Sequence, residues 1–242
     1  MNLFVCIDDT DNLDSIGTGE LLENMMREAA VRGLGKSGFI VRYQFLIDDA
    51  IPYTSHNSAM CCTAQTDDRA AFTAFCEDFL RRTAAEGSDP GLCILTDDPE
   101  KDYEPLVAFG RRAQTEVLTK ADALAAAKAF GADVHLSEHG GTGDGVIGAL
   151  AGAGLRAGKE EGRIKGKLHP PLNKPDWSMA EFAAAYGAER FADEDGNEIT
   201  RDLPLRFEWP TKLVFQHGKV TAVLVQQNGQ WMPKPKIRKN RG

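Results

Sequence analysis

Four aspartates follow an apolar segment near the start of the chain. Residues 4–7 are Phe-Val-Cys-Ile, and Asp8, Asp9 and Asp11 come next, with Asp14 close behind. Carboxylates so close together repel one another, and a divalent cation among them relieves the repulsion. We therefore predict that Asp8, Asp9 and Asp11 bind Mg²⁺ and take part in catalysis. The alternative is that they are ordinary turn and N-cap residues at the end of a strand.

A glycine-containing turn follows the aspartates. Gly17, Thr18 and Gly19 precede a helical pattern, and the backbone N–H groups at a helix N-terminus suit phosphate oxygens. We predict that this turn, with Thr10, contacts the phosphates of a nucleotide. The aspartates and the turn together predict a site for Mg²⁺ and a nucleotide.

A second glycine-rich segment lies near the middle of the chain. It consists of Gly140, Gly141, Thr142, Gly143, Asp144 and Gly145, followed by a Gly/Ala-rich helical pattern. It fits neither a Walker A loop nor a Rossmann fingerprint. One interpretation is a phosphate-binding loop, and the other is a helix that packs closely against its neighbours. Asp144 is either a second metal ligand or a cap for the helix.

Other polar side chains could complete a pocket. His56 and Asn57 could line it, with turn formation as the alternative, and His139 could be a base or a phosphate donor, with a structural histidine as the alternative. Positive charge for phosphates could come from residues of the basic segment, namely Arg156, Lys159, Lys165 and Lys167. Among these, we assign Lys165 to the substrate pocket.

The elements that must position these residues follow a regular order. Hydrophobic periodicity predicts strands over 2–7, 39–47, 58–66 and 91–95, and helices over 18–32 and 69–85. This order is the split βαβ of a ferredoxin-like fold in the α/β (α+β) class. The first and fourth strands need not be neighbours, so the order alone does not place Asp97 and Asp98 beside the first aspartates. We assign the phenylalanines of the second helix to the core.

The chain is expected to have three parts. Residues 1–98 form the ferredoxin-like part, residues 99–165 a helical and glycine-loop part, and residues 166–242 a part with antiparallel strands. In the last part, Ser178 and Glu181 form a capping-box pattern at a short helix. His217-Gly218 and Asn228-Gly229 are typical of hairpin turns.

Composition limits the classes of partner. The 242 residues carry a formal net charge of −8, which argues against a nucleic-acid binder that uses its whole surface. A local RNA contact could use the basic segment 234–241, whose alternative is a solvated terminus. The five cysteines lie in apolar runs and are expected to be buried and reduced. With no signal peptide or membrane-spanning segment, we expect a cytoplasmic protein.

Three segments together resemble one family, the archaeal tRNA-isoleucine 2-agmatinylcytidine synthetases. Residues 6–11, Cys-Ile-Asp-Asp-Thr-Asp, match its opening motif, and residues 51–59 correspond to its Ile-Pro-Trp-Lys-Thr-Arg-Gly-Asn-Gly-Ala stretch. Residues 89–91, Asp-Pro-Gly, and 143–151, Gly-Asp-Gly-Val-Ile-Gly-Ala-Leu-Ala, provide the third match. The resemblance spans roughly residues 2–155.

The resemblance implies an enzyme that uses ATP and Mg²⁺ to phosphorylate an oxygen of a nucleoside, which an amine then displaces. It further implies that Thr18 is a catalytic residue, because it corresponds to a threonine that becomes phosphorylated during ATP turnover. The chain departs from the family by lacking the paired cysteines of its zinc ribbon and the length for its OB-type domain. A small substrate, or tRNA held by a separate RNA-binding subunit, is therefore also considered. A nucleotide-binding regulatory or accessory module without turnover is the alternative function.

Overall fold

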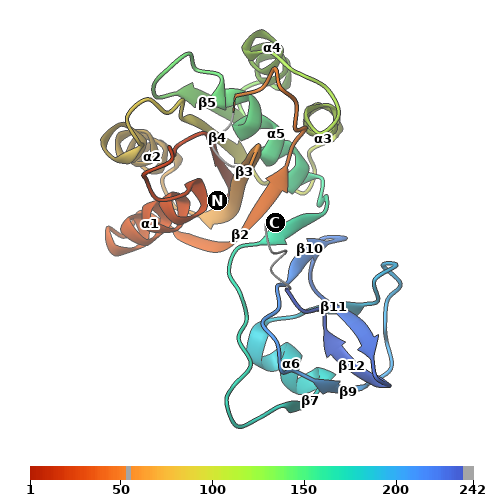
Figure 1. Ribbon diagram of the computed structural model, residues 1–242. Coiled ribbons are helices and arrows are strands. Elements are labelled where there is room, and N and C mark those ends of the chain that lie inside the picture. Colours follow the sequence, from red (N-terminus) through yellow and green to blue (C-terminus); the bar gives the residue numbers. More distant parts are fainter. Residues whose placement is uncertain (53–55, 237–242) are drawn as a thin grey trace. The chain divides into compact units, whose positions relative to one another are not determined.

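The computed structural model describes residues 1–52 and 56–236. The chain divides into two compact units, Met1–Lys159 and Glu160–Gly242 (Figure 1). The three-part division after residues 98 and 165 stays a prediction. Residues 53–55 of the second motif and 237–241 of the basic segment lie outside the described residues.

The first unit is built on an antiparallel sheet. Its strands are β1 (Asn2–Asp8), β2 (Lys36–Gln44), β3 (Ser58–Gln65), β4 (Gly91–Thr96) and β5 (Val134–Glu138). They lie in the order β5-β4-β1-β3-β2, and each neighbouring pair is antiparallel. The order β4-β1-β3-β2 is that of a split βαβ fold, so the predicted fold class is confirmed.

Helices cover both faces of this sheet (Figure 1). They are α1 (Thr18–Val31), α2 (Arg69–Thr83), α3 (Glu104–Ala113), α4 (Lys120–Phe130) and α5 (Gly145–Ala157). The side chains of α1 and α2 share a core with Leu3, Val5 and Ile7 of β1. The alternate residues of β1 face α5, because Cys6 and Asp8 lie against glycines of that helix. Residues 3–7 of β1 are therefore buried from both sides.

The phenylalanine stripe of α2 lies in the core. Phe72, Phe75 and Phe79 are 1%, 6% and 4% exposed, which confirms the prediction. The five cysteines are also buried, as expected of small apolar side chains. Both results follow from helical and strand periodicity, which places apolar positions on the face toward the neighbouring layer.

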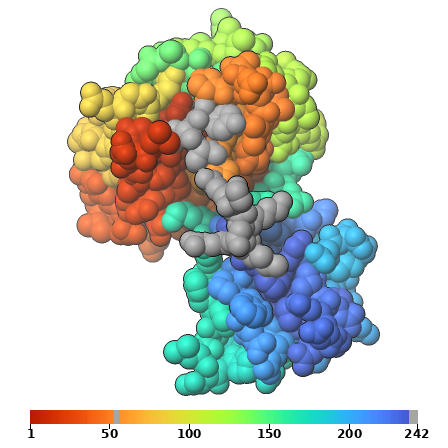
Figure 2. Space-filling view, viewed as in Figure 1, coloured from red at the N-terminus to blue at the C-terminus, as the bar shows by residue number. Residues whose placement is uncertain are grey.

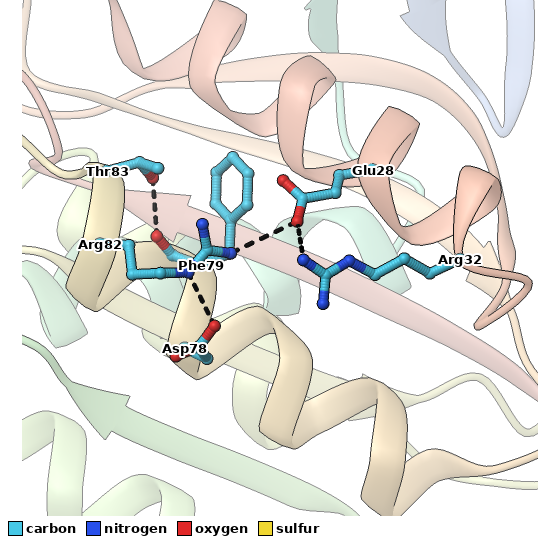
Figure 3. Close-up of polar contacts among 6 residues, drawn as sticks. All are labelled: Glu28, Arg32, Asp78, Phe79, Arg82 and Thr83. Carbon is cyan, nitrogen blue, oxygen red and sulfur yellow. Dashed lines mark hydrogen bonds and ion pairs between the residues drawn. The ribbon is translucent and has the colours of Figure 1, made fainter.

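Charged side chains join α1 to α2 at the surface (Figure 3). Arg82 bonds Asp78 at 2.8 Å and lies 3.4 Å from Glu28, which also pairs with Arg32. The guanidinium of Arg82 also lies over the ring of Phe79. Because these groups are solvated, we expect the network to contribute little to the free energy of folding.

The two acidic strand ends lie at opposite edges of the sheet. β1 and β4 are neighbours, a point that the sequence pattern left open, and they run antiparallel. The amide of Asp97 bonds the carbonyl oxygen of Asn2 at 2.9 Å, at the start of β1. Asp97 and Asp98 are therefore remote from the aspartates at the end of β1.

The second strand differs from its prediction. It covers Lys36–Gln44 instead of 39–47, with an irregularity between Ser37 and Ile40. Apolar residues occupy every second position from Phe39 to Ile47, which predicts that they face the core. Val41 and Tyr43 are fully buried as this alternation predicts, but Ile47 lies beyond the strand and is 59% exposed. Phe39 is 37% exposed beneath the guanidinium of Arg156, at 5.1 Å. The alternation of apolar residues in the sequence extends to Ile47, whereas the strand ends at Gln44.

The second unit is a small β-rich fold. Its elements are β6 (Gly162–Ile164), β7 (Asp176–Ser178), α6 (Met179–Tyr186), β8 (Arg190–Ala192), β9 (Pro204–Arg206), β10 (Val214–Gln216), β11 (Lys219–Gln227) and β12 (Gln230–Pro233). The strands run β6-β10-β11-β12-β9-β7, with β8 parallel to β11. Phe182 lies at the centre of an aromatic cluster that includes Trp177 and Phe207.

Local sequence signals in this unit are confirmed. Ser178 and Glu181 form both bonds of the capping box at α6. His217 and Asn228 have φ values of 53° and 52°, and the glycine after each is also left-handed, as type I′ hairpin turns require. In the described part of the chain, 1–52 and 56–236, no helix is both long enough and apolar enough to cross a membrane.

Candidate functional site

A cavity of about 260 Å³ opens in the first unit at the end of β1. Its described lining includes Asp8, Asp9, Asp11, Gly17, Thr18, Gly19, Arg42, Phe45, His56, Asn57, Met60, Asp89, Leu118, Asp144, Gly145 and Gly148. The loop before α1 (red) and the segment after β2 (orange) lie on one face of this unit (Figure 2). One part of the cavity is thus acidic, and another is lined by apolar side chains.

Asp8 lies at the floor of the acidic part, facing α5. A Cβ atom at Gly148 would come within 1.7 Å of its Oδ2, so the helix approaches the carboxyl closely only because residue 148 is glycine. Burial, and then the negative charges of Asp9 and Asp11, raise the pKa of Asp8 from 3.8 to about 8. The carboxyl of Asp8 therefore gains or loses its proton at a pH near neutrality.

Asp9 follows in a left-handed conformation, with φ of 49°. Its pKa is raised to about 6, first by burial and then by the charges of Asp89, Asp11 and Asp144. Negative charge from three chain segments, around residues 9, 89 and 144, therefore converges on the cavity. A bound cation would offset this repulsion.

The predicted Mg²⁺ site has ligands of suitable chemistry. Asp8, Asp9 and Asp11 line one cavity, and carboxylate oxygens are the protein ligands that Mg²⁺ prefers. Within residues 1–52 and 56–236, however, no three His, Cys, Asp or Glu side chains converge as a metal-binding group. Mg²⁺ binding by these aspartates stays a prediction.

Thr18 connects the aspartates to the first helix. Its Oγ1 donates a hydrogen bond of 2.9 Å to Oδ1 of Asp11. The N-cap of α1 is Gly17, which has no side chain to bond the first-turn amides, and Gly17 to Gly19 line the cavity. The positive end of the α1 dipole therefore faces the cavity and favours an anion there.

The glycine-rich segment before α5 is held differently. The amides of Thr142, Gly143 and Asp144 donate to the carboxylate of Asp89. Of the predicted loop, Asp144 and Gly145 belong to the described cavity lining, whereas Gly140, Gly141, Thr142 and Gly143 do not. Phosphate binding by this loop stays a prediction, but three of its amides already bind a carboxylate of the protein.

The glycines of α5 allow close packing, which was the alternative interpretation. A Cβ atom at Gly145 would lie 2.0 Å from the carbonyl oxygen of Asp89, and one at Gly152 would lie 2.6 Å from Sγ of Cys6. A Cβ at Gly154 would lie 2.2 Å from the carbonyl oxygen of Leu106. The helix therefore sits against the sheet and α3 at a separation that side chains at these positions would prevent.

The remaining predicted residues lie in varied places. His56 and Asn57 line the cavity, and Asn57 is fixed by a bond from Nδ2 to the carbonyl oxygen of Leu46 at 2.7 Å. Thr10 is only 2% exposed and lies outside the described lining, so its contact with phosphate stays a prediction. His139 also lies outside that lining and bonds Ser137 at 2.9 Å. Burial lowers the pKa of His139.

The predicted cations do not line the described cavity. Arg156 is 7% exposed and stacks on Phe39, which leaves it within the packing of the first unit. Lys165 and Lys167 belong to the second unit, so their contact with a substrate stays a prediction. Of the lysines and arginines in the described residues, the cavity lining includes Arg42 alone.

Arg42 and Asp89 are among the lining residues that were not proposed as site residues from the sequence. Arg42 stands between the buried Val41 and Tyr43, so strand alternation could have placed it on the other face of β2. Asp89 belongs to the Asp-Pro-Gly motif, but nothing in the motif showed that it bonds the segment before α5. That pairing joins residues more than fifty positions apart and depends on the tertiary fold.

Comparison with known proteins gives structural relatives only. No family model and no curated protein matches the sequence. A crystal structure of TiaS in complex with an isoleucine tRNA and ATP matches with a TM-score of 0.55 and 28% identity, over 64% of this chain and 36% of that chain. The complex of TiaS with the same tRNA, AMPCPP and agmatine gives 0.53 and 27%, over 63% of this chain and 36% of that chain.

A third solved structure, a tRNA fluorescent labelling enzyme, matches with a TM-score of 0.55 and 25% identity, over 74% of this chain and 38% of that chain. TiaS is an agmatidine synthetase of isoleucine tRNA, the family that the sequence motifs resemble. The resemblance is therefore confirmed for about two thirds of the chain, and the fold is agmatidine-synthetase-like. The chain spans little more than a third of the length of these relatives, 36% in the first comparison.

Proposed function

We propose that this chain is an ATP- and Mg²⁺-dependent enzyme of the agmatidine synthetase type. It phosphorylates an oxygen of a nucleoside or small substrate, and an amine then displaces the phosphate. In the first step a bond forms between the substrate oxygen and the terminal phosphorus of ATP, the bond from that phosphorus to its bridging oxygen breaks, and the remaining nucleotide leaves. In the second step the amine nitrogen bonds to the substrate carbon, the C–O bond breaks, phosphate leaves and the nitrogen gives up a proton to solvent.

The observation that carries this proposal is the cavity in which Asp8, Asp9, Asp11 and the α1 N-terminus meet. The solved structures that this chain resembles include TiaS complexes whose names record ATP and AMPCPP. Phosphoryl transfer depends mainly on positioning and on stabilising negative charge, which a helix N-terminus and cations supply. The cavity is lined by the N-terminus of α1, by one arginine and by the carboxylates proposed to hold a cation.

Each side of the cavity has a role in this proposal. The first-turn amides of α1 contact phosphate oxygens, and Arg42 provides positive charge near them. Phe45, Met60 and Leu118 form an apolar wall suited to a flat ring. Thr18, held by Asp11, lies at the same helix terminus and is the candidate for the family's phosphorylated threonine.

Asp8, Asp9 and Asp11 are the residues that would hold Mg²⁺. The ion, when bound, neutralises charge on the triphosphate and on the phosphoryl group in transfer. The raised pKa values of Asp8 and Asp9 are consistent with carboxyls whose ionised forms are not offset by a cation among the described residues. Charge compensation therefore links metal binding to the ionisation of both residues.

RNA and an amine are the proposed partners of this chain. The relatives' names include an isoleucine tRNA and agmatine, but this chain covers only 36% of the length of such a structure. We propose that tRNA, if it is the substrate, is held with the help of a separate RNA-binding subunit. A small amine is the proposed second substrate.

The test combines binding with turnover. Calorimetry with AMPCPP and Mg²⁺ measures binding, and release of phosphate or AMP from ATP, with and without tRNA and an amine, measures turnover. Asp8→Ala and Thr18→Ala should each lower turnover at least about 100-fold. Asp14→Ala is the matched control, because Asp14 is an exposed aspartate of the same loop outside the described cavity lining.

The outcomes separate the candidate functions. Turnover that both variants abolish and the control retains supports the enzyme, and a requirement for tRNA identifies the acceptor class. Binding of AMPCPP without turnover under any condition would replace this proposal with a nucleotide-binding module. No binding at all would refute both.

A further inference from the structure

We propose that Asp89 is a positioning residue for the cavity. Its carboxylate occupies the N-terminus of α5 from within the protein and ties the segment before that helix to the end of β1. This inference rests on the proposed function for its kinetic readout, but its structural readout is independent of that function.

The Asp89 carboxylate accepts four hydrogen bonds from one short segment of the chain. Oδ1 accepts from the amide of Gly143 at 2.5 Å. Oδ2 accepts from the amide of Thr142 at 3.1 Å, from its Oγ1 at 2.5 Å and from the amide of Asp144 at 3.2 Å. Three of these four bonds go to Oδ2 and one goes to Oδ1, so the carboxylate of Asp89 is held mainly by the segment 142–144.

The backbone of Asp89 provides the second connection. Its amide donates to the carbonyl oxygen of Asp9 at 3.0 Å, where β1 has ended and the chain has turned into a left-handed conformation. One residue thus bonds both the aspartate segment through its main chain and the glycine segment through its side chain. The relative positions of Asp9 and Asp144, which both line the cavity, depend on it.

The glycines around Asp89 make this close approach possible. Gly141 has φ of +58°, and a Cβ atom there would lie 2.8 Å from Cγ of Asp89. A Cβ at Gly145 would lie 2.0 Å from the Asp89 carbonyl oxygen. Glycines at positions 141 and 145 therefore allow the segment between them to surround the carboxylate of Asp89.

The two helix N-termini at the cavity consequently have different roles. The N-terminus of α5 is already supplied with an anion by Asp89, whereas that of α1 has no capping side chain. We therefore expect the phosphates of a ligand to lie at α1, and Asp89 to act on the reaction only through the groups it holds in place.

The experiment measures amide hydrogen exchange in the full chain and ATP turnover in parallel. In Asp89→Asn, the new amide group would place N–H donors against N–H donors. Exchange at residues 142–144 should rise at least about tenfold, since each bond to a charged acceptor is worth that much or more. Turnover should fall at least about tenfold, while the Kd for AMPCPP changes less than about threefold because its phosphates lie at α1.

Three further variants keep the test decisive. Thr142→Val removes only the hydroxyl donor and should give a smaller rise in exchange, even if Asp89→Asn folds poorly. Asp89→Ala with added acetate should recover protection at residues 142–144, because acetate supplies the missing carboxylate. Asp68→Asn is the control, since Asp68 bonds the Ala71 amide at 3.0 Å at the start of α2, outside the described cavity lining.

Unchanged exchange at residues 142–144 in both Asp89→Asn and Thr142→Val would overturn the inference. So would a loss of turnover in the Asp68 control equal to that in Asp89→Asn. If exchange rises as expected but no form of the protein turns over ATP, the proposed function fails and the structural role of Asp89 stands.

Discussion

Replacing Asp8 by Asn should make the metal-free protein more stable in alkaline solution. The pKa of Asp8 is about 8 in the folded chain and 3.8 in the absence of its surroundings. Between about pH 4 and pH 8 the folded state therefore retains a proton that the unfolded state has lost. Stability conferred by the protonated carboxyl is complete below about pH 4 and is lost as the pH rises toward 8.

The size of the effect follows from the shift. A pKa rise from 3.8 to about 8 corresponds to at most about 6 kcal/mol. Because Asp8 is only partly buried and borders the cavity, solvent screening reduces this to about 2–3 kcal/mol. Asn has the same shape as the protonated acid but does not titrate, so Asp8→Asn should match the parent near pH 4 and exceed it by about 2–3 kcal/mol near pH 8.

Urea denaturation in EDTA at about pH 4, 6 and 8 measures this difference. Some pH dependence should remain in the variant below about pH 6, because Asp9 still titrates there. Asp14→Asn, an exposed change in the same loop, should leave the parent's pH dependence as it is. If Asp8→Asn gives a curve parallel to that of the parent, the carboxyl is not forced into a shifted ionisation and our account of the acidic cluster is wrong.

Three other predictions test separate features. Gly148→Ala should cost about 1–3 kcal/mol by urea denaturation, since its Cβ would lie 1.7 Å from Oδ2 of Asp8, whereas Gly17→Ala, with 3.9 Å to its nearest neighbour, should cost less than about 1 kcal/mol. Arg42→Ala should weaken AMPCPP binding at least about tenfold in calorimetry, with Arg42→Lys intermediate; equal affinities would remove Arg42 from the phosphate contacts. Arg82→Ala should lower the melting temperature by less than about 4 °C, and a larger drop would contradict a solvated network.

The ferredoxin-like order was predictable because each of its elements carries a local signal. The phenylalanines of α2 repeat at helical spacing, and the strands around Cys6 and Cys93 are short apolar runs. The position of the Asp97 end could not be inferred, because periodicity fixes an element's type and not its neighbour in the sheet. The predicted strand extended to Ile47 for the same reason, because periodicity does not show where pairing with the neighbouring strand ends.

The cavity was predictable in part for a related reason. Asp8, Asp11 and Thr18 are close in sequence, so their meeting needs only a strand end and a turn. Arg42 and Asp89 reach the cavity through tertiary packing from β2 and from the residues before β4. The amides of residues 142–144 were predicted to face a ligand, and the carboxylate that they bind lies more than fifty residues away.

The sandwiching of β1 between two helical layers has a mechanical consequence for the charged groups at its end. A strand at a sheet border can fray and let its last residues swing into solvent, but β1 is held by β3 and β4 along nearly its whole length. Asp8 is thus held in place by the buried strand that it ends. Its carboxyl can escape an unfavourable ionisation only by taking up a proton, by acquiring a counterion or by unfolding the unit around it.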